Sequence, residues 1–301
     1  MLRGLFFLAL LPAALVAQAG NTGMSFLGNG VGARNIAMGE SGVAAAHAGT
    51  ALYFNPSIIA AERRPSIVIA HTQSIEDINA QFLGVVLPSA GWSFGMQFGI
   101  QSVPGIPIRD VPGPALGDFT SRDIVFGLSA ATQLGSAIDV GATAKLLYEK
   151  IYVDDATGYA VDLGVRVRPI DAGAFKDLSL GASLSNLGSM SDMRTEATTL
   201  PKLLRFGAAW GQSFGVAGSA ITVAADGVKV LDGDVLHLQA GVEVCYEEMA
   251  FLRAGYQSNY DTKGFTAGLG VAYSVLRFDY ALTPGLQSFG STHAFSVSIL
   301  F

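Results

Sequence analysis

The sequence has little of what a water-soluble domain of this size usually contains. Charged residues make up only 14% of its 301 residues, whereas about 25% is usual in soluble domains. Cys245 is the single cysteine, which excludes an intramolecular disulfide. Beyond Val16, no apolar run reaches the ~18 residues that a membrane-spanning helix needs. The hydrophobic content of 50% therefore requires another explanation.

Motifs for catalysis, metal binding and nucleotide binding are also scarce. No HExxH, CxxC or GxSxG occurs, and the four histidines share no ligand spacing. The glycines of 28–33 loosely match a dinucleotide-binding loop, but no strand precedes them, so close packing is the better interpretation. The net charge of −6 argues against nucleic acid binding. We expect no enzymatic activity, no cofactor and no metal site.

Two kinds of polar cluster leave chemical alternatives open. Ser291 and His293 could form the Ser–His pair of a barrel lipase or deacylase. The acidic pairs at 154–155 and 232–234 could bind Ca²⁺. A polar rim and ordinary turn chemistry explain these clusters more simply.

From about Pro65 onward, the chain consists of segments of roughly ten residues in which apolar and polar positions alternate. Side chains alternate between the two faces of a strand, so each segment has one hydrophobic face. This pattern predicts an all-β fold, a transmembrane antiparallel β-barrel of about 14 strands. The expected strands are 65–73, 78–88, 91–102, 121–134, 136–152, 156–168, 177–187, 202–213, 218–230, 235–246, 249–258, 263–274, 275–283 and 292–301.

The lengths of the connections support a barrel with two different ends. Bacterial outer-membrane barrels have short periplasmic turns and longer outer loops. If the first strand runs outward, the connections after even strands are short, as at 88–91 and 247–248. The connections after odd strands are longer, as at 103–120, 188–201 and 284–291. A soluble β-sandwich, the alternative fold, gives no reason for this alternation.

Charged residues within the strands fall on the face that is rich in small residues. Arg or Lys on the lipid face at mid-bilayer would cost ~2–4 kcal/mol, so these charges are expected to point into the lumen. There they can form an ion network that stabilises the barrel, a simpler interpretation than a charged ladder that conducts substrates. The predicted network comprises Asp139, Lys145, Asp162, Arg166, Arg205, Glu243, Arg253 and Asp279, with Arg253 and Asp279 as a candidate pair.

Both ends of the chain carry patterns that are typical of an exported protein. Residues 1–19 combine a cationic start, an apolar run and a small-residue cleavage pattern, which predicts a signal peptide cleaved near Ala19. The last strand ends on Phe301, which is similar to the insertion signal that outer-membrane barrels present to their insertion machinery. We therefore expect an outer-membrane location in a Gram-negative-type bacterium, with lipid as the surrounding solvent.

Residues 20–64 do not alternate and are small, apolar and interrupted by glycine. They suit short helices and tight turns in a confined space, so we expect a plug in the lumen of the barrel formed by 65–301. Asn55 and Pro56 mark a sharp break in this plug, because proline disfavours helical backbone at the residue before it. The asparagine side chain can hydrogen-bond the nearby backbone.

Several motifs together resemble the PorV/PorQ family of outer-membrane proteins, which is related to FadL-type fatty-acid transporters. They are Gly32-Ala-Arg-Asn-Ile-Ala-Met-Gly39 and Ala51-Leu-Tyr-Phe-Asn55-Pro56-Ser57 in the plug, with Ser185-Asn186-Leu187-Gly188, Leu252-Arg253-Ala-Gly255-Tyr256 and Phe278-Asp279-Tyr280-Ala281 in the barrel. The chain departs from the family in having Ser57 where alanine is usual and in its short loops.

The resemblance implies two alternative functions. A PorV-like barrel would be a non-enzymatic partner in type IX protein secretion or surface attachment, bound to secretion components or exported proteins. A FadL-like barrel would transport a hydrophobic ligand past the plug and sideways through a defect in the wall. The short loops favour the secretion partner, and a plain porin is third because an apolar plug should block it.

Overall fold

The computed structural model describes residues 23–109, 111–168, 177–194, 198–215, 218–285 and 290–301. The predicted signal peptide, 1–19, and the first residues of the predicted plug lie outside these ranges. The strands are β1 Ser66–Gln73, β2 Asn79–Ser89, β3 Trp92–Ile108, β4 Gly117–Leu134, β5 Ile138–Ile151, β6 Asp154–Val167, β7 Leu178–Met190, β8 Leu203–Ser213, β9 Ala220–Val230, β10 Leu236–Tyr246, β11 Ala250–Ser258, β12 Phe265–Tyr273, β13 Leu276–Thr283 and β14 Thr292–Leu300.

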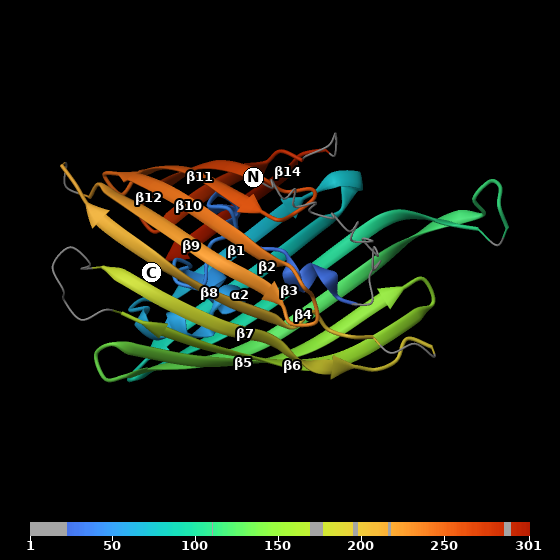
Figure 1. Ribbon diagram of the computed structural model, residues 1–301, viewed down its shortest axis with the longest axis horizontal. Coiled ribbons are helices and arrows are strands. Elements are labelled where there is room, and N and C mark those ends of the chain that lie inside the picture. Colours follow the sequence, from blue (N-terminus) through green and yellow to red (C-terminus); the bar gives the residue numbers. More distant parts are fainter. Residues whose placement is uncertain (1–22, 110, 169–176, 195–197, 216–217, 286–289) are drawn as a thin grey trace, which may run out of the picture.

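These fourteen strands form one closed antiparallel barrel in which each strand pairs with its neighbours in the sequence. The barrel closes where β1 pairs with β14, in a continuous register from Ser66 opposite Leu300 to Gln73 opposite His293. Figure 1 shows the resulting tilted cylinder. The predicted fold class is therefore confirmed. Among the described residues, no helix is long and apolar enough to cross a membrane.

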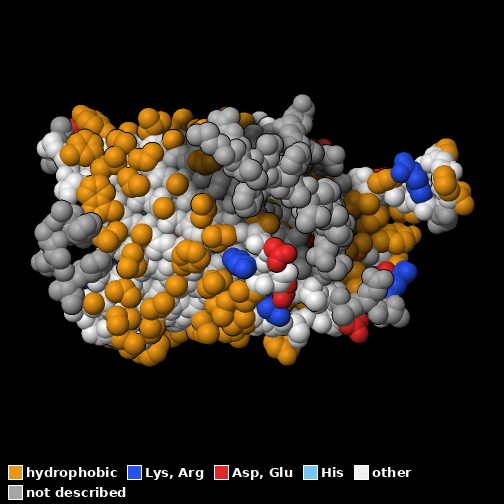
Figure 2. Space-filling view, in the orientation of Figure 1, with side chains coloured by type: hydrophobic (Ala, Val, Ile, Leu, Met, Phe, Trp, Pro, Cys, Tyr) orange, Lys and Arg blue, Asp and Glu red, His pale blue; other side chains and the backbone are white. Residues whose placement is uncertain are grey.

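Hydrophobic side chains cover the outside of the barrel wall. Exposed apolar residues alternate with buried ones along the strands, as in β12, where Phe265, Leu269 and Val271 are exposed and Thr266 is buried. In Figure 2 orange side chains spread over the wall, and most charged side chains lie toward the end where the β3–β4 hairpin projects. An exterior of this kind suits a lipid bilayer, since the backbone groups behind it are paired within the sheet.

The structure corrects one prediction about the connections. Residues 103–120 were expected to form a long outer loop, but most of them extend β3 and β4 into a hairpin that projects beyond the barrel. The register of β3 and β4 shifts between Val103 and Ile106, and pairing then continues to Ile108 opposite Gly117. The prolines and glycines of this stretch concealed the strands, because an irregular hairpin outside the membrane tolerates residues that a regular strand does not.

The segment before β1 folds into short helices inside the barrel (Figure 1). These are η1 Ser25–Gly28, α1 Ala33–Ala37, η2 Ala48–Thr50, α2 Ala51–Phe54 and η3 Pro56–Ala61, and η4 Ile75–Asp77 follows β1. We call residues 23–62 the plug. Its helices contact the wall on opposite sides, α1 against β11 to β14 and η3 against β3 to β6. Several contacts need glycine in the wall, because the plug backbone lies directly against the strand backbone.

Gly84 is the clearest of these contacts and gives a testable prediction. A Cβ at Gly84 would lie 2.5 Å from the carbonyl oxygen of Gly49, too close for either backbone to remain in place. We expect Gly84→Ala to displace η2 and to destabilise the docked plug by about 1–3 kcal/mol. Hydrogen–deuterium exchange of the plug amides should increase.

Gly211→Ala is the matched control. A Cβ at Gly211 would have no neighbour closer than 3.9 Å, so this variant should exchange like the wild type. Equal exchange in both variants and the wild type would contradict the proposed close contact between plug and wall.

Candidate functional site

The predicted plug turn at Asn55 is a hydrogen-bonded junction between plug and wall. The Asn55 side chain donates to the carbonyl oxygens of Val43 and of Val165 in β6, at 2.8 and 3.0 Å. Its oxygen accepts from the backbone and the hydroxyl of Ser57, at 3.1 and 2.7 Å. Asn55 caps η3, with Pro56 as the first helical residue. Gly164 lies so close to the Asn55 oxygen that a side chain there would displace it.

Two further contacts between plug and wall involve charged groups. The Asp226 carboxylate in β9 accepts hydrogen bonds from the backbone of Gly42 and Val43, at 2.6 and 2.8 Å. The Arg34 guanidinium in α1 donates to both oxygens of Glu243 in β10, at 2.8–3.2 Å. Glu243 belongs to the predicted network, whereas Asp226 and Arg34 were not among the predicted site residues. Both contacts are buried, where charge-assisted hydrogen bonds are strong.

The predicted lumen charges point inward but divide into separate groups. Lys145 lies 2.6 Å from Asp162, and Asp139 lies 2.6 Å from Arg166. The largest group surrounds Glu243, which contacts Arg34 of the plug and Arg253 of the wall. The remaining wall contacts of this group are Arg277 to Glu243 and Asp279 at 3.1 and 3.0 Å, and Arg253 to Asp279 at 2.9 Å.

Arg205 differs from the other predicted charges. It is only 4% exposed, and none of the carboxylates that the structure describes lies within ion-pair distance. Its guanidinium donates to the Tyr53 hydroxyl at 3.1 Å and lies 5.0 Å from the centre of that ring. The contact holds α2 of the plug against β8 through hydrogen bonding and a cation–π interaction. Burial raises the pKa of Tyr53 to about 12, so its hydroxyl stays protonated and donates to the carbonyl of Leu27.

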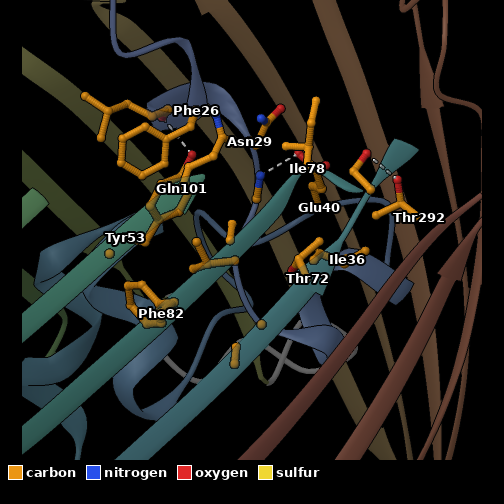
Figure 3. Close-up of a pocket in the computed structure, with 18 of the residues that line it drawn as sticks. Phe26, Asn29, Ile36, Glu40, Tyr53, Thr72, Ile78, Phe82, Gln101 and Thr292 are labelled. Carbon is orange, nitrogen blue, oxygen red and sulfur yellow. Dashed lines mark hydrogen bonds between the residues drawn. The ribbon is translucent and has the colours of Figure 1, made fainter. Parts of the chain in front are cut away.

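Beside Tyr53, the plug and the wall surround a cavity of about 370 Å³. Figure 3 shows Phe26, Ile36 and Tyr53 of the plug and Phe82 of β2 among the residues around this space. Strands β1, β2 and β3 contain no Asp, Glu, Lys or Arg, so the part of the lining that they supply is uncharged. The strand residues of this lining are Ala70, Thr72, Ala80, Gln81, Phe82, Gln97, Gly99, Gln101, Val125, Lys145, Thr283 and Thr292.

The connections at the predicted outer end surround the cavity. Ile75 and Ile78 follow β1, and Lys263 lies between β11 and β12. Lys263 donates to the carboxylate of Glu40 in the plug at 2.9 Å. Its positive charge at the entrance is therefore compensated. The arrangement can receive an apolar molecule of small to moderate size from the outer end.

The other predicted residues have no catalytic or metal-binding arrangement around them. His293 Nδ1 lies 2.9 Å from the Tyr280 hydroxyl. Asp154 forms an ion pair with Arg194 at 2.7 Å. Phe301 is exposed, and its backbone N–H donates to Pro65. Within the described ranges, no group of three or more His, Cys, Asp or Glu side chains could hold a metal ion.

Sequence reasoning missed the cavity, although a signal for it was present. Lumen-facing charges are frequent from β5 onward, whereas β1 to β3 have none. A barrel whose inner face is apolar on one side and charged on the other has two chemically different halves. Nothing in the sequence indicates that Glu40 and Lys263 form an ion pair, because this contact depends on the path of the plug.

Comparison with solved structures gives independent evidence on the fold. The Ralstonia pickettii toluene transporter TbuX matches with a TM-score of 0.62 at 13% identity, over 90% of this chain and 98% of that chain. The P. putida toluene transporter TodX matches with 0.61 at 15%, over 90% and 99%. A Pseudomonas aeruginosa FadL homologue matches with 0.53 at 11%, over 90% and 98%. The fold is that of FadL-like outer-membrane barrels.

The comparisons do not support the more specific resemblance to the PorV/PorQ family. No protein-family model matches the sequence, and no curated protein matches it. The PorV/PorQ resemblance therefore gains no support, whereas TbuX is described as a toluene transporter and a further match, CymD, as a monoaromatic hydrocarbon channel. At identities this low the likeness establishes the fold alone, and the function must be argued from the lumen.

Asn55 provides a direct test of how the plug is held. We expect Asn55→Ala to destabilise the docked plug by about 1–3 kcal/mol, because the variant leaves buried backbone groups of Val43 and Val165 without their donor. Single-channel conductance should show openings that the wild-type barrel lacks.

Ser57→Ala is a control for which we expect a smaller effect than for Asn55→Ala. It removes one donor to Asn55 but leaves the contacts of Asn55 with Val43 and Val165 in place, so its effect should be smaller. Conductance of Asn55→Ala identical to that of the wild type would count against a gating role for the plug.

His47 predicts how stability depends on pH. Its Nε2 lies 3.3 Å from a guanidinium nitrogen of Arg277, so it must accept and stay neutral. Burial, reinforced by the charges of Arg34 and Arg277, holds the pKa of His47 well below its usual range despite the opposing charge of Glu243. Below about pH 6.5, His47 binds a proton in the unfolded chain but not in the folded protein. The free energy of unfolding therefore falls as the pH falls through that value.

From pH 7.5 to 5.5, wild-type protein should lose about 1 kcal/mol more stability than His47→Gln, which keeps an acceptor but cannot titrate. Thermal unfolding of both proteins at the two pH values measures the difference. Parallel pH profiles would show that His47 does not contribute.

Proposed function

We propose that this barrel transports hydrophobic small molecules across the outer membrane. The observation that carries the proposal is the apolar cavity between the plug and β1 to β4, surrounded by connections at the predicted outer end. A barrel that only holds a partner protein needs no such space beneath its entrance. The descriptions of TbuX, TodX and CymD as transporters or channels of toluene or monoaromatic hydrocarbons favour the same class of substrate.

The pairing of β6 with β7 contains an irregularity that a sideways exit could use. Strands β2 and β3 pair without interruption from Asn79 to Ser89, so the wall is regular there. The register of β6 and β7 shifts between Val161 and Leu163, and Asn186 in β7 has a φ of 62°. Lys145, which lines the cavity, bridges Asp162 and Asn186 at this point.

The secretion-partner interpretation is the weaker of the two original alternatives. It was favoured because the loops are short, but the β3–β4 hairpin shows that part of the outer end is larger than expected. Neither the fold comparisons nor the described surface supplies evidence for a type IX component or an exported protein as partner.

An uptake assay with a cavity-filling variant tests the proposal. Thr72 lines the cavity, whereas Ile69 on the same strand faces outward and is exposed. We expect cells that produce the wild-type barrel to take up toluene or oleate faster than cells without it. Thr72→Phe should abolish most of this gain, because the new ring occupies the cavity.

Ile69→Phe is the matched control, since it adds the same ring on the lipid face, and it should transport like the wild type. No uptake above background by correctly assembled wild-type protein, with either ligand, would overturn the proposed function. Equal uptake by Thr72→Phe and wild type would show that transport does not pass through this cavity.

A further inference from the structure

Cations on the outward face of the described strands occur only toward one end of the barrel. The other Lys and Arg residues of the strands point into the lumen. Those that face outward are Arg122 in β4, Lys150 in β5 and Lys229 in β9, and each lies toward the predicted outer end of the wall. At this level a side chain meets the headgroups of the surrounding membrane, where anionic groups attract a cation.

Lys229 has a second lysine beside it on the same face of the sheet. It lies opposite Leu204 of β8. Just before β8, the carbonyl oxygen of Lys202 accepts a hydrogen bond from the backbone N–H of Leu231 at 2.9 Å, so the pairing of β8 with β9 continues to this point. Lys202 and Lys229 are therefore diagonal neighbours, about 7–8 Å apart.

The two lysines have no acidic partner among the described residues. Neither side chain forms an ion pair there. Asp232 and Asp234, in the connection between β9 and β10, are exposed to solvent and do not lie within ion-pair distance of either lysine. The two ammonium groups repel each other unless an anion lies between them.

An apolar groove lies in the outer surface of the wall, across β7 to β11, which are neighbours in the barrel (Figure 1). Large side chains stand around a lower floor. The outward-facing residues of the groove are Leu180, Phe206, Ala208, Ala225, Gly227, Leu238, Ala240 and Tyr256. A Cβ at Gly227 would lie 2.6 Å from the ring of Phe206, so this ring lies directly against the backbone of β9 and forms one side of the groove.

The register of the strands places this groove directly beside the lysines. Gly227, two residues before Lys229 on the same face of β9, lies opposite Phe206 and Leu238. A strand rises about 3.3 Å per residue, so the groove begins about 7 Å along the strand from Lys229, toward the middle of the membrane. A phosphate and the first carbons of an acyl chain, joined by a short linker in a lipid, fit this spacing.

We infer that Lys202, Lys229 and the groove bind a phosphorylated lipid of the outer leaflet. The phosphate lies between the two ammonium groups, and one acyl chain occupies the groove. A dimer formed through this face would instead bring the lysines of both copies together, so the charges favour a lipid. The site lies on the outside of the barrel, so the inference does not depend on the proposed transport through the lumen.

Native mass spectrometry of the detergent-solubilised barrel tests the inference. The probes are bisphosphorylated lipid A, phosphatidylethanolamine and inorganic phosphate, and the dissociation constant of each is measured by titration. We expect lipid A to bind the wild type most tightly, since it combines acyl chains with uncompensated phosphate charge. The double variant Lys202→Gln with Lys229→Gln should bind lipid A about tenfold more weakly. Ala225→Leu fills the groove and should also weaken lipid A severalfold.

Arg64→Gln and Ala254→Leu are the matched controls. Arg64 is an exposed cation that precedes β1, at the opposite end of the barrel. Ala254 is an exposed residue on the outward face of β11 that does not line the groove. Both variants should bind lipid A like the wild type, because they change charge and bulk away from the proposed site.

Four outcomes would overturn the inference. Equal affinity of the double lysine variant and the wild type for lipid A would exclude the headgroup contact. Equal affinity of Ala225→Leu and the wild type would exclude the acyl chain from the groove. Inorganic phosphate bound as tightly as lipid A would indicate a site for free anions. A protein dimer in place of a lipid adduct would identify a second copy of the chain as the occupant.

Discussion

Pairing of β1 with β14 is the constraint on which the rest of the structure depends. A bilayer offers no hydrogen-bond partners to the backbone, so a membrane-spanning sheet must close on itself. Closure leaves every side chain in a strand only two environments, the lipid outside or the lumen inside. Charged residues in the spanning strands are therefore placed inside, where they pair with one another and with the plug.

The lumen that results has two halves with different chemistry. On one side Asp226 and Glu243 hold the plug through its backbone and through Arg34. Such buried charges contribute only when their hydrogen bonds are satisfied, and removing one partner is more damaging than removing both. On the other side β1 to β3 carry no charge, and the plug leaves an apolar cavity. Firm attachment on the charged side lets the plug stay in place while the apolar side remains open to a ligand.

Much of the fold could be predicted from the sequence, because apolar residues at every second position indicate a strand with one hydrophobic face. Phe265, Leu269 and Val271 alternate with small and polar residues, and this pattern alone identifies β12 as a wall strand. The extended β3–β4 hairpin could not be predicted, since Pro104 and Pro107 within β3 are unusual in a regular strand.

The candidate site was harder to predict for a different reason. Sequence shows which charges face inward but not which ones meet, because that depends on register and on the shear of the barrel. Lys145 reaches Asp162 across β5 and β6, while Arg205 finds a tyrosine of the plug instead of a carboxylate. The cavity depends on how the plug packs, and no local pattern reports that. For the same reason, the sequence could not decide between a secretion partner and a transporter.

The most direct measurement is the structure of the barrel crystallised with bromobenzene, whose bromine can be located by anomalous diffraction. We expect a bromine peak inside the lumen, between Phe26 of the plug and Phe82 of β2. Bromine found only on the lipid-facing exterior, with the lumen empty of ligand at saturating concentration, would contradict it.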